Sequence, residues 1–222
     1  MTPLIFIGFA ALVIALIVIG HIQAKKRREA FQLLAQELGF RYIQGRDRGL
    51  PSKFHFLQHL DDGSNRYAEN ILYGDLDGQQ AYAFDYHYET YSRDSKGRRQ
   101  TNHHWFSVFT LELPDSFPEL IIKPEGLFAK LGQMLGFDDI DFESLEFSKR
   151  YSVKSPDKKF AYDFCNAQMI EFLLVQQDLI IEVDRDVLSL TFRGRLAVEQ
   201  IRPNIARIQR IRALMPNYLF TR

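Results

Sequence analysis

Cysteine, tryptophan and net charge are all scarce in this sequence. Its 222 residues include one cysteine and one tryptophan, and 28 basic side chains are balanced by 28 acidic ones. A single cysteine excludes a scaffold held by internal disulfides. Because no positive charge is in excess to neutralise phosphates, a uniformly basic nucleic-acid-binding surface is excluded, and no nucleic-acid partner is expected. The 46% of hydrophobic residues excludes a disordered chain, since such chains are poor in apolar side chains.

A long apolar run lies near the N-terminus. Residues 3–22 contain no Asp, Glu, Lys or Arg, and apolar side chains occupy every face of the helix that they would form. At 1.5 Å per residue, about 20 helical residues span roughly 30 Å, which matches the hydrocarbon thickness of a bilayer. The sequence therefore predicts a single transmembrane helix, with residues 1–24 as the membrane anchor.

Four basic residues follow the apolar run directly: Lys25, Lys26, Arg27 and Arg28. A cleaved signal peptide would carry its positive charge before the apolar run and would end at small residues, so we expect an uncleaved anchor. By the positive-inside rule, the N-terminus lies outside and the C-terminal domain lies in the cytoplasm, at the inner membrane of a bacterium. The four cations are expected at the membrane interface as a topology signal, where they can also pair with anionic headgroups of the lipid bilayer.

The soluble part begins with a second helical pattern. Apolar residues recur at helical spacing up to Leu38, and Gly39 is a typical helix terminator. We therefore expect a basic juxtamembrane helix over residues 25–39. The cytoplasmic domain is expected over residues 40–222, with a possible subdivision near residues 114–125.

Alternating side chains in the first half of the domain predict antiparallel strands. Asp77 and Gly78 form a strong hairpin-turn pair between two aromatic-rich segments. In the second segment, Asp85, His87 and Glu89 share the smaller, more polar face of the expected strand.

The polar stretch 92–104 is expected to be a long exposed loop between two strands of a second hairpin. Pro114 and Pro118 are expected to end the strand that follows it. The strands expected in this half are 40–44, 67–75, 79–91, 105–113 and 120–123, and residues 53–60 are expected to form a weak helix.

The second half of the domain mixes helical and strand patterns. Helices are expected at 126–135, 157–165, 168–176 and 203–214, strands at 141–146 and 147–154, and a hairpin of 179–183 with 187–192 around a turn at 184–186. Strands that pair through hairpins together with separate helices indicate an α+β fold, with antiparallel β-hairpins and covering helices.

The last helix carries an apolar stripe formed by Ile201, Ile205, Ile208 and Met215. Arg207 and Arg210 lie on its opposite side, so the helix can either cover the sheet or lie on an anionic membrane. The stripe has no large aromatic side chain, which favours the covering role.

A group of residues in the segment 142–174 follows a pattern known from other bacterial proteins. The pattern places a strand E-x-x-F-…-F/Y-x-V before D-x-x-x-A-Y and a short helix ending in Leu-Leu. The residues that carry the resemblance are Tyr151, Val153, Asp157, Ala161, Tyr162 and Met169, together with Glu146 and Phe147, which are adjacent here and lack the E-x-x-F spacing. The segment thereby resembles an uncharacterised bacterial domain-of-unknown-function family of membrane-anchored proteins. The resemblance implies a hydrophobic N-terminal segment and no particular activity.

The sequence offers few candidates for chemistry. His55 and His59 are four residues apart and could reach one metal from one helix face, but no third ligand is indicated. His103 and His104 are adjacent, so in an extended chain their side chains point to opposite faces and cannot chelate together. Cys165 is expected to be a small buried hydrophobe. No catalytic residue, cofactor site or metal site is therefore predicted.

These observations favour a non-catalytic binding or scaffolding domain, held at the cytoplasmic face for a protein or peptide partner. Two alternatives remain open. One is a membrane-tethered hydrolase using His87, His103 and His104, which would require these imidazoles to converge with a carboxylate within about 4 Å. The other is a structural subunit of an envelope complex.

Overall fold

The computed structural model describes residues 2–125, 139–176 and 179–221, with side chains from Leu12 onward except that of His59. The helix expected at 126–135 lies outside the described residues. Among the described residues, six strands form one antiparallel sheet in the order β1-β2-β3-β4-β5, with β6 also paired to β4. The strands are β1 (Arg41–Ile43), β2 (Ser64–Leu76), β3 (Gln79–Arg93), β4 (Arg99–Pro124), β5 (Tyr151–Lys154) and β6 (Ile180–Arg193).

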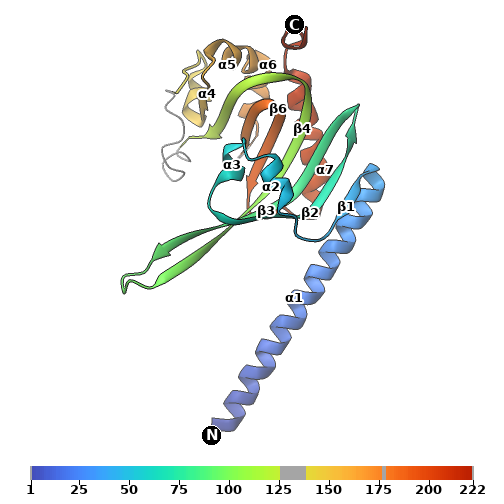
Figure 1. Cartoon of the computed structure of the whole chain (residues 1–222), viewed down its shortest axis with the longest axis vertical. Coiled ribbons are helices and arrows are strands. Elements are labelled where there is room, and N and C mark those ends of the chain that lie inside the picture. Colours follow the sequence, from blue (N-terminus) through green and yellow to red (C-terminus); the bar gives the residue numbers. More distant parts are fainter. Residues whose placement is uncertain (1, 126–138, 177–178, 222) are drawn as a thin grey trace.

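Helices cover both faces of this sheet, which confirms the α+β class (Figure 1). They are α1 (Thr2–Leu38), α2 (Gly49–Lys53), α3 (Gln58–Asp61), α4 (Leu145–Arg150), α5 (Lys158–Phe164), α6 (Ala167–Leu174) and α7 (Ile201–Leu214), with 3₁₀ turns at Val198–Gln200 and Asn217–Phe220. The larger core packs α1, α5, α6 and α7 against one face. The smaller core lies under α2 and α3 on the other face.

The hairpin of β2 and β3 forms where the sequence predicted it. Asp77 and Gly78 have φ angles of 54° and 83°, so both adopt the left-handed conformation of a type I′ turn. The Asp75 side chain accepts a hydrogen bond of 2.8 Å from the backbone nitrogen of Gly78, which holds the turn closed.

The expectation of a long exposed loop at 92–104 was wrong. Cross-strand pairing of β3 and β4 continues from Ala81 with Leu111 to Arg93 with Arg99. The Asp94 carboxylate closes the short turn, because it accepts hydrogen bonds of 2.9 Å from two backbone nitrogens beyond it. Much of this outer part is exposed on both faces, so polar side chains are compatible with strand pairing there.

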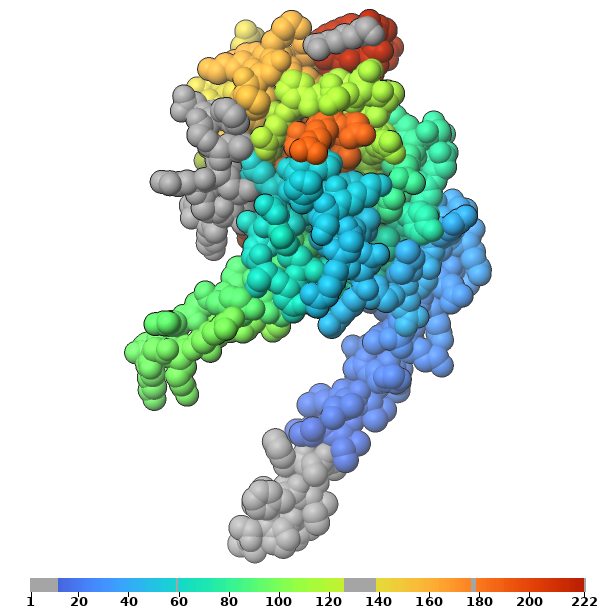
Figure 2. Space-filling model, viewed as in Figure 1, coloured from blue at the N-terminus to red at the C-terminus, as the bar shows by residue number. Residues whose placement is uncertain are grey.

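The outer part of this hairpin, residues 90–102, is called the arm below. Figure 1 shows the arm and the N-terminal part of α1 leaving the body of the domain on the same side, and Figure 2 shows both standing clear of it. The arm contains four basic side chains against one acidic one, namely Arg93, Lys96, Arg98 and Arg99 against Asp94.

Two prolines do not end β4, contrary to expectation. Pro114 and Pro118 lie where the pairing register of β4 with β6 shifts. Pro114 lies between the paired residues Glu112 and Phe117, and Pro118 lies between the paired residues Phe117 and Leu120. Proline has no backbone N–H to donate to the neighbouring strand. Where the strand pairing is irregular, the missing hydrogen bond is tolerated.

The predicted hairpin around 184–186 was also wrong, because β6 runs through this segment as one strand. Arg185 has a φ of 53° and pairs with Phe117 of β4. The local polar residues therefore mark an irregularity in a continuous strand and not a reversal of the chain.

The segment 145–150 is helix α4, where a strand was expected. The Ser144 side chain accepts a hydrogen bond from the backbone nitrogen of Phe147, which caps the helix, and Phe147 is fully buried. The next two helices begin near the expected positions, since Asp157 and Asn166 cap α5 and α6 in the same way.

The last helix, α7, covers the sheet, as its pattern favoured. Ile201, Ile205, Ile208 and Met215 are all buried in the larger core. Arg210 is exposed, whereas Arg207 is half-buried.

Helix α1 is one continuous rod, and the two ends of its described part have different surroundings. Phe31, Leu34 and Ala35 are buried in the larger core, whereas residues 12–26 are exposed. Gly39 has a φ of 68° and follows the helix end, as expected for a left-handed terminator. Among the described residues, no helix is both long enough and apolar enough to cross a membrane.

The close approach of β2 to the chain after α1 gives a test of the packing. A Cβ atom on Gly74 would overlap the ring of the buried Phe40, so Gly74→Ala should lower the free energy of unfolding by about 1–3 kcal/mol. Gly45→Ala is the matched control, because nothing lies within 4 Å of its Cβ position. Urea unfolding followed by the fluorescence of Trp105 measures both; equal stability of the two variants would contradict this packing.

Candidate functional site

Helix α1 is fixed to the sheet by an ion pair on the face that carries the larger core. Arg27 donates from Nη2 to Oδ2 of Asp85 at 2.8 Å, and from Nη1 to the carbonyl oxygen of Leu196 at 2.8 Å. The Asp85 side chain, from β3, is 1% exposed and that of Arg27 is 24% exposed. A cation from the expected membrane-interface cluster is therefore bound inside the domain.

The Asp85 carboxylate is fully engaged within the protein. The Asn70 amide donates to its Oδ2 at 2.9 Å, and the Ser107 hydroxyl donates to its Oδ1 at 3.1 Å. Ser107 Oγ also accepts a hydrogen bond of 2.9 Å from the backbone nitrogen of Leu196. The network joins α1, β2, β3, β4 and the segment after β6, and we call it the α1 joint.

Tyr42 extends the α1 joint to β1. Its hydroxyl donates to Oδ1 of Asn70 at 3.0 Å, and its ring stacks on Phe31 of α1 with centroids 5.8 Å apart. Burial raises the pKa of Tyr42 to about 12, so the phenol keeps the proton that it donates.

The other three cations of the cluster have different surroundings. Lys25 and Lys26 are exposed. Lys25 Nζ lies 3.8 Å from Oε1 of Glu29, which follows one helical turn later. Arg28 is half-buried and lines a cavity of about 350 Å³ between α1 and β2, together with Arg195 and Glu69. Arg195 forms an ion pair with Glu69.

A second group of functional side chains lies farther along the same face of β3 and β4. In the cross-strand register, Glu89 pairs with His103 and His87 pairs with Trp105. His87 Nε2 lies 3.0 Å from His103 Nδ1, and His103 Nδ1 lies 3.6 Å from Glu89 Oε1. We call His87, Glu89 and His103 the histidine cluster; these three residues could hold a metal ion.

The surroundings of His87 and Glu89 favour the forms of these two side chains that bind metals. Burial lowers the pKa of His87, which keeps its imidazole neutral; the backbone of Asn65 opposes this shift. The hydrogen bond from the Asn65 amide is the main cause that lowers the pKa of Glu89, and one from Tyr91 adds to it. The sequence grouped His87 with His103 only in the hydrolase alternative and predicted no metal site, because without the register between β3 and β4 it could not show that Glu89 lies opposite His103 and that His104 points to the other face.

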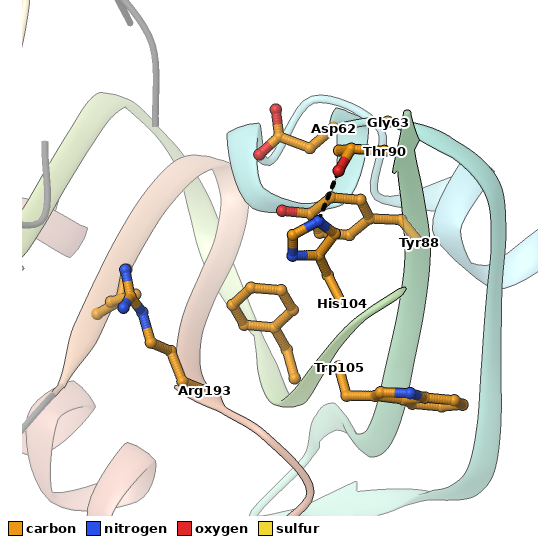
Figure 3. Close-up of a pocket in the computed structure, with 9 residues that line it drawn as sticks. Asp62, Gly63, Tyr88, Thr90, His104, Trp105 and Arg193 are labelled. Carbon is orange, nitrogen blue, oxygen red and sulfur yellow. Dashed lines mark hydrogen bonds between the residues drawn. The ribbon is translucent and has the colours of Figure 1, made fainter. Parts of the chain in front are cut away.

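His104 lies on the opposite face and lines a pocket of about 490 Å³ (Figure 3). Its Nε2 lies 2.8 Å from Thr90 Oγ1, and its ring stacks on Tyr88 with centroids 4.6 Å apart. Asp62 and Arg193 lie at separate edges of the pocket, while the Trp105 ring points away from it (Figure 3). The pocket therefore offers an aromatic wall with groups of opposite charge at its rim.

The remaining sequence candidates do not form sites. His55 lies between α2 and α3, so it does not share one helix with His59, whose side chain is outside the described residues. Cys165 is buried, and burial raises the pKa of its thiol, as expected for a packing residue.

Comparison with known proteins identifies a similar fold but no family. No family model and no curated protein matches the sequence. Among solved structures, the chain is similar to the crystal structure of the mycobacterial trehalose monomycolate transport factor A, with a TM-score of 0.61 and 12% identity over 84% of this chain and 90% of that chain. This likeness shows the α+β fold alone. The family resemblance of the segment 142–174 stays a prediction.

The α1 joint makes a prediction about stability. Arg27→Met leaves the buried Asp85 carboxylate without its cation, so the free energy of unfolding should fall by about 3–5 kcal/mol. Lys26→Met removes the same charge from an exposed position and should change it little. Urea unfolding of the two detergent-solubilised proteins compares them, and an equal loss in both variants would refute the joint.

Proposed function

We propose that this chain is a membrane-anchored, non-catalytic accessory factor of an envelope transport system. In this proposal its domain binds a protein or peptide partner at the cytoplasmic face of the bacterial inner membrane. The observation that carries the proposal is helix α1, which continues from the apolar run into the larger core and is fixed there by Arg27 and Asp85. A binding surface on the domain would thereby have a set orientation relative to the anchor.

The exposed part of α1 supports the anchor. Large apolar side chains are exposed along it, namely Leu12, Val13, Ile14, Leu16, Ile17, Val18, Ile19 and Ile22. A continuous apolar surface of this kind marks a site of contact with another protein or with a membrane. The exposed cations Lys25 and Lys26 follow at once, as expected at the boundary of a bilayer on its cytoplasmic side.

The arm supports the same orientation. It leaves the domain on the side of the anchor, and its excess of basic side chains suits a surface of anionic lipid headgroups. Near its outer end the Arg99 guanidinium lies 3.7 Å from the ring centroid of Tyr91, which is 47% exposed. Tyrosine and arginine are both common at membrane interfaces.

The transport role comes from the structural neighbour, whose name describes a transport factor. In the α1 joint, the polar side chains of Asp85, Asn70 and Ser107 are all hydrogen-bonded within the protein. Because these groups hold the fold together, they fit a binding protein better than a catalytic site. The pocket beside His104 is the surface that we assign to the partner, because its aromatic wall and its charged rim suit a peptide segment.

Membrane fractionation and reporter fusions test the anchor. The full-length protein should stay in the membrane pellet after alkaline carbonate extraction, and fluorescent protein fused to its C-terminus should be bright. Alkaline phosphatase fused at the same place should be inactive, because that enzyme requires the periplasm. Release by carbonate, or an active phosphatase, would overturn the proposal.

Affinity purification in mild detergent tests the partner. A membrane transport protein should co-purify with the wild type and with His55→Ala, and it should be depleted several-fold with Arg193→Glu. Arg193 is exposed at the pocket rim, so reversing its charge should leave the fold intact. Equal recovery with wild type and Arg193→Glu would argue against this pocket, and absence of any transport protein would argue against the function.

A hydrolase is a second candidate, because His103 and Glu89 converge at 3.6 Å with His87 beside them. His104 lies on the other face, so only His87 and His103 of the three histidines share a site. Hydrolysis of p-nitrophenyl esters that is lost in His103→Ala and retained in His104→Ala would favour this candidate. The structural-subunit alternative predicts a stable envelope complex after crosslinking.

A further inference from the structure

The histidine cluster has the spacing of a metal site. In a tetrahedral zinc site with bonds of about 2.0–2.1 Å, two ligand atoms lie roughly 3.3 Å apart. The two imidazole nitrogens are 3.0 Å apart and the carboxylate oxygen is 3.6 Å from the nearer one. All three ligand atoms lie within 4.8 Å of one another, so a small side-chain rotation brings them onto one ion.

The surrounding residues hold the ligands in place before any ion binds. The His87 ring packs on Tyr67 and Trp105, with both centroid distances 4.5 Å. The Asn65 amide donates to Glu89 Oε1 at 2.6 Å, and the Tyr91 hydroxyl donates to Oε2 at 3.2 Å. Partners that orient a ligand in this way are typical of metal sites, where they fix the direction of the donor atoms.

The donor set selects the class of ion. Two imidazoles with one carboxylate suit zinc and neighbouring divalent transition metals, whereas magnesium and calcium prefer oxygen ligands. His103 is 57% exposed, so the side of the site toward solvent is open for water as a further ligand.

We propose that His87, Glu89 and His103 form a binding site for one divalent transition-metal ion, best matched by Zn²⁺, at the base of the arm. The ion links β3 to β4 where the hairpin leaves the body of the domain. Metal binding therefore stiffens the arm relative to the sheet. This site is separate from the α1 joint and from the pocket beside His104.

Titration with zinc chloride tests the site on the full-length protein in detergent after chelator treatment. Isothermal calorimetry should give one equivalent of Zn²⁺ for the wild type. The affinity should fall at least about 100-fold in His103→Ala and at least about tenfold in Glu89→Gln, because each variant loses a ligand. With Co²⁺ in place of Zn²⁺, the wild type should show visible absorption bands that His103→Ala lacks.

His104→Ala is the matched control, because it removes the neighbouring imidazole from the other face and should bind Zn²⁺ as the wild type does. The melting temperatures of the metal-free variants check that each one is folded; His103 is largely exposed, so its replacement should leave the fold intact. Unchanged zinc affinity in His103→Ala, or no saturable binding by the wild type, would overturn the proposal whatever the result for membrane anchoring.

Discussion

The ion pair between Arg27 and Asp85 is the constraint on which the arrangement of helix and domain depends. Removing two charges from water costs several kcal/mol per ion, and this cost is recovered only where further hydrogen bonds satisfy the carboxylate. Asn70 and Ser107 supply those bonds from the neighbouring strands, and Leu196 accepts from the guanidinium. The energetically favourable position of α1 is therefore the one that aligns Arg27 with this network, so the helix leaves the sheet in a defined direction.

This pairing changes the role of the basic cluster. From sequence, all four cations were expected at the membrane interface, because the positive-inside rule depends on the position of charge along the chain and not on its partners. In the folded chain, Lys25 and Lys26 remain exposed whereas Arg27 is bound to β3 and Arg28 lines a cavity. Arginine suits the inner position, since its planar guanidinium can bind a carboxylate and a carbonyl oxygen at once.

Local signals in the sequence predicted local structure well. The turn at Asp77 and Gly78, the end of α1 at Gly39 and the start of α5 at Asp157 depend on residues within a few positions, so each could be recognised. The arm and the continuous course of β4 and β6 could not, because pairing with a distant strand decides whether a polar segment or a proline lies in a sheet. Helix α4 also depends on a local signal, the Ser144 cap, although the side-chain pattern of this segment predicted a strand.

The pairing register of β3 with β4 also decides which functional side chains meet. Asp85, His87 and Glu89 were recognised as one polar face of a strand, yet the sequence could not tell which cations and imidazoles would meet them. The register places Ser107 opposite Asp85 and His103 opposite Glu89, so one strand face serves the α1 joint at one position and the histidine cluster two and four residues later. Both elements that project from the domain, α1 and the arm, are thus positioned by neighbouring side chains of β3. A change in the register of β3 against β4 would disturb both at once, which couples the direction of the helix to the structure at the base of the arm.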